Sequence, residues 1–220
     1  NVPLSHTARN PLRICELAGR SDIRVFGGSE HPMGRKLVTA EHVHGKTGLD
    51  GPDLPEPRMK LQAKPGVDYL IEMLRASDKG EITLVTLGPL TDIGLALRRA
   101  PEIAGKIREI VMMAGAYFEV GNITPTAEFN VYVDPTAADL VLRSGVPVTM
   151  MPLDVTHRVL VTPERMERLF KLGNRSAKAL AEALTFSRSV EVNKYGWEGA
   201  PLHDASTRAY LLKPELFQGR

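Results

Sequence analysis

The chain has 220 residues, of which 43% are hydrophobic and 25% are charged, and its formal net charge is +2. These values are ordinary for one globular domain and exclude a strongly basic surface for nucleic acid. A single cysteine, Cys15, excludes an internal disulfide and a cysteine zinc cluster and suits the cytoplasm, and no apolar run reaches the roughly 18–20 residues that cross a membrane.

Short apolar runs bounded by Gly or Pro predict strands, and segments of helical periodicity lie between them. In chain order the pattern predicts helix 5–19, strand 22–28, a loop over 28–63, helix 64–77, strand 81–88, helix 88–100, strand 108–115, helix 134–145, strand 146–152, and helices 162–173 and 174–194. Pro11 predicts a break or a late start in the first helix. Because the strands are continuously apolar, we expect an open, mainly parallel α/β sheet with helices on both faces, in a single domain over residues 1–220.

Polar residues gather in the segments that leave the predicted strands, where an open parallel sheet binds its ligands. The stretch "NITPTAEFNVYVDP" (122–135) holds Asn122, Glu128 and Asn130, and its Asp134 is explained as the N-cap of the helix that starts at Pro135. Asparagine donates and accepts hydrogen bonds, and an ionised glutamate accepts them. The three residues therefore predict a site that binds vicinal hydroxyl groups. The alternative makes Asn122 a turn residue and Glu128 a solvated loop charge.

The stretch "PLHDAS" (201–206) places His203 beside Asp204 at the start of a predicted helix. Asp204 is interpreted either as an N-cap or as a metal ligand, and His203 either as an exposed side chain or as a general acid.

Further histidines and aromatic residues carry weaker predictions. His42 and His44 could begin a zinc site, but no third ligand has a suitable spacing. Asp154 and His157 favour a structural role that closes a strand. Tyr195 and Trp197 could stack on an aromatic ligand or belong to a core or lid.

Four segments together resemble the inosine-uridine preferring nucleoside hydrolases: "GPLTDIGLAL", "AGAYFEVGNITPTAEFNVYVDPTAA", "MMPLDVTHRV" and "PLHD". The likeness extends over nearly the whole chain, and the loop containing "EFN" together with the distant "HD" pair makes it specific. It implies hydrolysis of the N-glycosidic bond of a ribonucleoside to ribose and a free base. It also implies a calcium ion that holds the attacking water and the ribose diol.

The resemblance also implies roles for individual residues, matched by motif. The ribose would be contacted by Asn130, Asn122, Glu128, Met113 and Asn1, of which Asn130 would also be catalytic, and His44 would lie near the base. His203 would give a proton to the leaving base in the members that accept purines, which favours tolerance of purines while the base preference stays open. Asp204 and the backbone carbonyl of Leu87 would be calcium ligands, a set of oxygen donors that suits this ion.

The sequence departs from the family at its N-terminus, where the run D-x-D-x-x-x-D-D has no counterpart. We therefore expect that the chain is part of a longer protein that carries these aspartates, and that the sheet is incomplete at both ends. The alternative from another class is a non-catalytic protein that binds ribose or a nucleoside. An unrelated α/β hydrolase or transferase using His203 and Asp154 lacks any nucleophile motif. The resemblance implies a cytoplasmic homodimer or homotetramer.

Overall fold

The computed structural model describes residues 1–219, apart from the side chains at 190, 191 and 193–195. The chain forms two compact units, and each is described here by itself. The first unit consists of residues 1–30, 38–65 and 160–201, and the second of residues 31–37, 66–159 and 202–220. The expectation of a single domain stays a prediction.

The second unit contains a parallel sheet of three strands, β1 (Ile82–Thr86), β2 (Ile107–Met113) and β3 (Val148–Met151), with β2 in the middle. Val85 pairs with Val111, and Met112 pairs with Met150. Three of the four predicted strands are therefore confirmed, together with their parallel direction.

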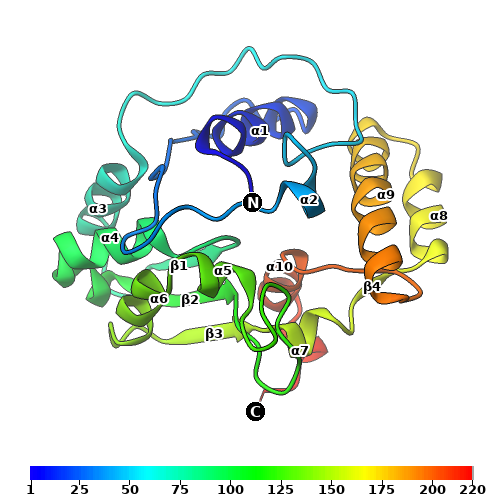
Figure 1. The fold of residues 1–220 in the computed structure, drawn as a ribbon. Coiled ribbons are helices and arrows are strands. Elements are labelled where there is room, and N and C mark those ends of the chain that lie inside the picture. The colour runs from blue at the N-terminus through cyan, green and yellow to red at the C-terminus, as the bar shows by residue number, and fades with distance from the viewer. Residues whose placement is uncertain (220) are drawn as a thin grey trace. The chain divides into compact units, whose positions relative to one another are not determined.

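Helices cover both faces of this sheet. Successive residues of a strand face opposite sides, and Ile110 and Met112 belong to one core with residues of α3 (Gly66–Ala76), α4 (Thr91–Arg99) and α6 (Pro135–Leu142). Figure 1 shows α4 and α6 together beside the strands. Val111 and Met113 are equally buried on the other side of β2, where α10 (Ala205–Leu212) packs. The predicted α/β architecture is confirmed.

Short helical segments complete the second unit. The α-helices α5 (Phe129–Val133) and α7 (Leu153–Thr156) follow the ends of β2 and β3, and the 3-10 helices are η1 (Pro101–Lys106) and η2 (Pro214–Leu216). None of the four was predicted, because segments of three to six residues are too short to show a helical period.

The first unit is mainly helical. It holds α1 (Leu4–Leu17), α2 (Glu41–His44), α8 (Pro163–Lys171) and α9 (Arg175–Tyr195), and β4 (Leu160–Val161) pairs antiparallel with β5 (Ala200–Pro201). Figure 1 shows α8 and α9 side by side. No helix in the described part of the chain is long and apolar enough to cross a membrane.

Two predictions for this unit were wrong. Helix α1 runs without interruption through Pro11, whose ring lies at the exposed surface, while the burial of Ala8 and Leu12 stabilises the helix on either side of it. The strand expected over 22–28 is reduced to one parallel bridge between Phe26 and Gln62. An apolar run becomes a strand only where a neighbour provides a ladder of hydrogen bonds.

The N-cap of α6 links three segments of the second unit. Asp134 is fully buried, and its Oδ1 accepts a hydrogen bond from the Ala137 N–H at 3.0 Å. Its Oδ2 accepts hydrogen bonds from the Thr91 hydroxyl at 2.7 Å and from the Met33 N–H at 2.8 Å. The predicted cap is confirmed, and the same carboxylate also fixes the start of α4 and the segment 31–37.

Replacing Asp134 with Ala should therefore lower the free energy of unfolding by about 3–5 kcal/mol, because two buried donors and one half-buried donor lose their acceptor. Urea denaturation measures this change. Asp139→Ala is the matched control, since Asp139 lies on the same helix but is exposed and pairs only with Arg143. The control should leave the free energy of unfolding nearly unchanged, and an equal loss in both variants would contradict this account.

Candidate functional site

The loop that leaves β2 is held by the carboxylate of Glu128. This side chain is 2% exposed; its Oε1 accepts from the Asn130 N–H at 2.8 Å. Its Oε2 accepts from the Gly115 N–H at 3.0 Å and from the Val131 N–H at 3.2 Å. Burial raises the pKa of Glu128, and the three N–H groups partly oppose this shift. The alternative that Glu128 is a solvated loop charge was wrong, because the carboxylate is the buried N-cap of α5.

Asn122 and Asn130 lie on either side of this cap. Oδ1 of Asn122 accepts a hydrogen bond from the Phe129 N–H at 2.8 Å, and Nδ2 of Asn130 donates to the Met113 carbonyl at 3.0 Å. The same Nδ2 is 3.4 Å from Sδ of Met113. These partners fix which end of each amide is oxygen. Within residues 1–219 no protein partner is found for Nδ2 of Asn122 or for Oδ1 of Asn130, so one donor and one acceptor remain.

Asp204 precedes α10 without capping it. The residue has helical backbone angles, and its side chain accepts no cap hydrogen bond. Solvent reaches the side chain, yet the protein around it opposes ionisation: burial, and then the charge of Glu128, raises the pKa of Asp204 to about 6. The N-cap alternative was therefore wrong. The negative charge of Glu128 acts on the Asp204 carboxyl group, so these two carboxylates interact electrostatically.

His203 is held by a residue that the sequence did not single out. Its Nδ1 lies 2.8 Å from Oγ1 of Thr156, which is fully buried at the end of α7. The ring centroid of His203 is 6.0 Å from that of His157. The only sequence signal for Thr156 is its place in "LDVTH", between Asp154 and His157, which have more reactive side chains.

Asp154 and His157 close the loop after β2. Asp154 accepts hydrogen bonds from the N–H groups of Tyr117 and Phe118 at 2.8 Å and of Glu119 at 3.3 Å. Burial tends to raise the pKa of Asp154, but these N–H groups outweigh it, and the pKa lies below its ordinary value. His157 Nδ1 is 3.3 Å from Oε2 of Glu119. A structural role of Asp154 is confirmed, although it closes the loop after β2 rather than a strand, and that of His157 stays a prediction.

The remaining predicted residue of the second unit is Leu87, which follows β1 directly. Its side chain is exposed, and the predicted role uses only its backbone carbonyl. The neighbouring hydroxyl of Thr86 is buried and has no hydrogen-bond partner among the described residues. An orphaned buried hydroxyl is the kind of atom that an additional bound group satisfies.

The other predicted residues belong to the first unit. The Asn1 carbonyl accepts from the Ala40 N–H at 2.7 Å. Burial, ahead of nearby positive charge such as that of His42, lowers the pKa of His44 to about 4. Trp197 is half-buried, and Tyr195 ends α9 with its side chain outside the described part of the structure. No group of three or more His, Cys, Asp or Glu residues suited to a metal was found among the described residues, so nothing here adds to the weak zinc prediction.

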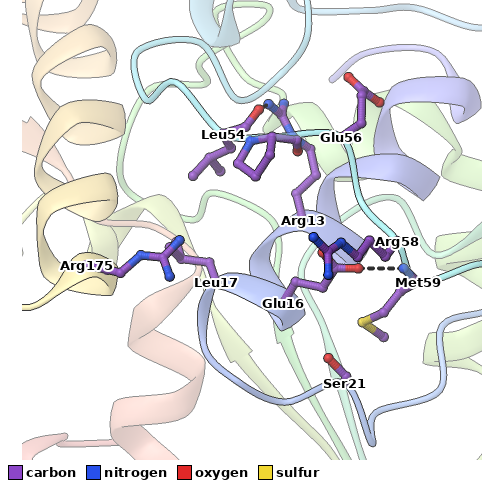
Figure 2. A pocket seen from close by; sticks show the side chains of 10 residues that line it. Arg13, Glu16, Leu17, Ser21, Leu54, Glu56, Arg58, Met59 and Arg175 are labelled. Atoms are coloured by element: carbon purple, nitrogen blue, oxygen red, sulfur yellow. Dashed lines mark hydrogen bonds between the residues drawn. The ribbon is translucent and has the colours of Figure 1, made fainter.

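A cavity of about 620 Å³ in the first unit contains none of the predicted residues. It lies between the end of α1, the segment 54–59 and the start of α9 (Figure 2). Glu16, which lines it, accepts a hydrogen bond from the Met59 N–H. The size of a cavity does not by itself identify a site. This one is lined by the carboxylates of Glu16 and Glu56 and by three arginines, but by no asparagine.

Comparison with known proteins gives consistent results. A model of the family described as inosine-uridine preferring nucleoside hydrolase matches residues 1–220. The chain is 50% identical over its whole length to an uncharacterised protein of Schizosaccharomyces pombe, covering 71% of that protein. It is 49% identical over 212 residues to the pyrimidine-specific ribonucleoside hydrolase RihA of Enterobacter sp. (strain 638), covering 96% of this chain and 67% of RihA.

Two solved structures share the fold. One is the purine-preferring ribonucleoside hydrolase from Gardnerella vaginalis, with a TM-score of 0.93 and 31% identity, covering 99% of this chain and 70% of that chain. The other is the plant nucleoside hydrolase PpNRh1, with a TM-score of 0.92 and 32% identity. The match covers 99% of this chain and 69% of PpNRh1.

The geometry around Glu128 predicts a large effect of its removal on stability. Glu128→Ala should lower the free energy of unfolding by about 2–4 kcal/mol, since three N–H groups at the end of β2 and the start of α5 lose their acceptor. Thermal and urea unfolding measure it. Glu81→Ala serves as control, because Glu81 is exposed and accepts from the Asp78 N–H alone. A loss no larger than that of the control would refute the structural role of Glu128.

Proposed function

This chain belongs to the inosine-uridine preferring nucleoside hydrolase family, and we propose that its substrate binds beyond the carboxyl end of β2, in the second unit. Membership confirms the reaction predicted from the sequence, which is hydrolysis of a ribonucleoside to ribose and a free base. The proposal concerns where this reaction takes place and which residues perform it.

The observation that carries the proposal is that the Asp204 carboxylate accepts no cap hydrogen bond and is repelled by the charge of Glu128. Glu128, Asp134 and Asp154 all accept hydrogen bonds from backbone N–H groups, which is what structural carboxylates do. Asp204 accepts none within the described residues, although the protein around it and the charge of Glu128 oppose its ionisation. Asp204 is exposed, so a ligand can reach its carboxylate, and an accessible carboxylate beside the charge of Glu128 is a candidate for binding a ligand.

The ribose is held, in this proposal, by the polar groups that the loop leaves unused. Nδ2 of Asn122 can donate to one hydroxyl and Oδ1 of Asn130 can accept from another. Glu128 keeps one acceptor position on Oε1, and Met113 lies against the Asn130 amide. Ribosyl transfer passes through an oxocarbenium-like state, so acceptors near the sugar stabilise it most when positive charge develops.

The leaving base takes its proton from His203. When the bond from C1′ to the base nitrogen breaks, its electron pair stays on the base, and the proton from the imidazole neutralises the resulting charge. A water oxygen forms the new bond to C1′ and releases one proton to the solvent, from which His203 is protonated again, so the products are ribose and the neutral base.

A metal ion is part of the proposal, because the family is metal-dependent. The donors that this chain offers are oxygens, namely the Asp204 carboxylate and the Leu87 carbonyl, and oxygen donors suit calcium. The fit is supported by the mutual charge of Asp204 and Glu128, which a cation would relieve, and by the orphaned Thr86 hydroxyl beside Leu87. When bound, the ion would orient and acidify a water molecule.

For the base, we propose a pyrimidine ribonucleoside as the preferred substrate, with inosine as the alternative. The relative with this specificity is 49% identical, whereas the purine-preferring enzyme is 31% identical. The roles of Asn1 toward the ribose, and of His44, Tyr195 and Trp197 toward the base, stay proposals from the sequence; these four residues belong to the first unit. A cytoplasmic homodimer or homotetramer also remains a proposal.

The alternative function is binding of ribose or a nucleoside without turnover. It is motivated by the missing run of N-terminal aspartates. Ligand binding without release of ribose by the full-length protein would favour it over the enzyme.

The decisive assay incubates the full-length protein with uridine, cytidine and inosine in the presence of calcium and measures reducing sugar. We expect ribose release, and a loss of at least about a hundredfold in kcat/KM for Asp204→Asn. The melting temperature of the metal-free variant should be unchanged or raised, because no described residue donates a hydrogen bond to the Asp204 carboxylate and its charge repels that of Glu128. Full activity of the variant would reject the proposed site, and no turnover by the wild type would reject the activity.

Removal of the metal gives a separate prediction. Dialysis of the full-length protein against a chelator should abolish ribose release, and added calcium should restore it more fully than zinc, because the proposed donors are oxygens. The same dialysis of Asp204→Asn should have no further effect. Full activity of the chelated wild type would contradict the metal assignment.

A further inference from the structure

Thr156 is buried against His203 in a way that the proposed function does not explain. Its side chain is completely inaccessible to solvent, and its Oγ1 is 2.8 Å from Nδ1 of His203. The two residues are 47 positions apart in the sequence, and both belong to the second unit. Thr156 is the last residue of α7, which begins directly after β3 and Pro152.

The direction of this hydrogen bond follows from the surroundings of the hydroxyl. A threonine hydroxyl has one hydrogen to donate and two lone pairs. Among residues 1–219, the side chain of Thr156 has no hydrogen bond other than the one to His203. A fully buried hydroxyl hydrogen without an acceptor costs free energy, so the hydroxyl donates to Nδ1 when the ring is neutral.

We propose that Thr156 is a positioning residue that fixes the ring of His203 and its tautomer. With Nδ1 accepting from Thr156, the neutral imidazole carries its proton on Nε2. To donate a proton the ring must be protonated, and in that state the hydroxyl oxygen accepts from Nδ1–H while the hydroxyl hydrogen gives up its acceptor. In both charge states Nδ1 is engaged by Thr156, and in the protonated ring Nε2–H is the group that serves the leaving base. The inference rests on the proposed function in that His203 is the proton donor.

The local fold is suited to holding this contact. The backbone N–H of Thr156 donates to the Pro152 carbonyl at 3.1 Å and that of His157 donates to the Leu153 carbonyl at 2.9 Å, so one turn of helix fixes the threonine. On the other side, the Leu202 N–H donates to the Val159 carbonyl at 2.8 Å, and the Ser206 hydroxyl donates to the Leu202 carbonyl at 3.1 Å. Hydrogen bonds to the backbone therefore fix the chain next to Thr156 and next to His203.

The first test compares Thr156→Val with Thr156→Ser in the full-length, metal-loaded enzyme. Valine keeps the shape and removes the hydroxyl, whereas serine keeps the hydroxyl. A positioned acid contributes roughly 10²–10⁴-fold to the rate, so valine should lower kcat on a nucleoside by about tenfold or more with little change in KM. Serine should recover most of the rate. Equal losses in the two variants, or no loss in valine, would overturn the proposal.

A substrate that needs no proton gives the matched control. 4-Nitrophenyl riboside releases a stable phenolate, so its hydrolysis should be insensitive to Thr156→Val, whereas hydrolysis of the nucleoside falls. In a His203→Ala background, Thr156→Val should cause no further loss on the nucleoside, because the threonine acts through the histidine. A uniform loss on both substrates, or an additive loss in the double variant, would mean that Thr156 is only structural.

A spectroscopic test does not depend on turnover. At a pH where the ring is neutral, the ¹⁵N–¹H spectrum of His203 should show a protonated Nε2 and an unprotonated Nδ1, and Thr156→Val should change this pattern. A proton on Nδ1 in the wild type would overturn the proposal. If His203→Ala leaves nucleoside hydrolysis intact while the tautomer is as expected, then the proton-donor role fails and the Thr156 contact stands.

Discussion

The second unit depends on how the buried carboxylate of Glu128 is satisfied. Three N–H groups, from Gly115, Asn130 and Val131, donate to it, and together they join the end of β2 to the start of α5. A buried carboxylate is costly unless it is hydrogen-bonded, so this one fixes the course of the loop between its partners. The cap also places the two asparagines next to Glu128. Oδ1 of Asn122 accepts a hydrogen bond from the Phe129 N–H, and Asn130 is the second residue of α5.

The same principle separates the structural carboxylates of the second unit from the one that we propose binds a ligand. Asp134 ties α6 to α4, and Asp154 ties the loop over 117–119 to α7, each through donors of the protein itself. Asp204 has no such donors among the described residues and feels the charge of Glu128. A cation or a ligand hydroxyl can therefore interact with Asp204 without breaking any contact that stabilises the fold, which is what a binding site requires.

The short helix α7 contributes both to the structure of the loop after β2 and to the position of His203. Its first turn carries Asp154, which holds the loop after β2, and its last residue is Thr156, which contacts His203. Because α7 begins directly after β3, the position of the histidine is set by the sheet rather than by a free loop. Such rigid placement is what proton transfer to a leaving base demands, since a small displacement of the acid costs much of its effect.

The sequence by itself determined the α/β class, three parallel strands, most helices and the N-cap at Asp134, because apolar periodicity and capping are local properties. It also identified the family through the loop containing Glu128 and the pair His203–Asp204. Only the tertiary structure decided that Glu128 is buried, that Asp204 is not a cap, that Pro11 leaves α1 intact, that residues 22–28 form a single bridge and that Thr156 meets His203. These facts depend on which distant segments lie beside each residue, and burial and hydrogen-bond partners are fixed only when the chain has folded.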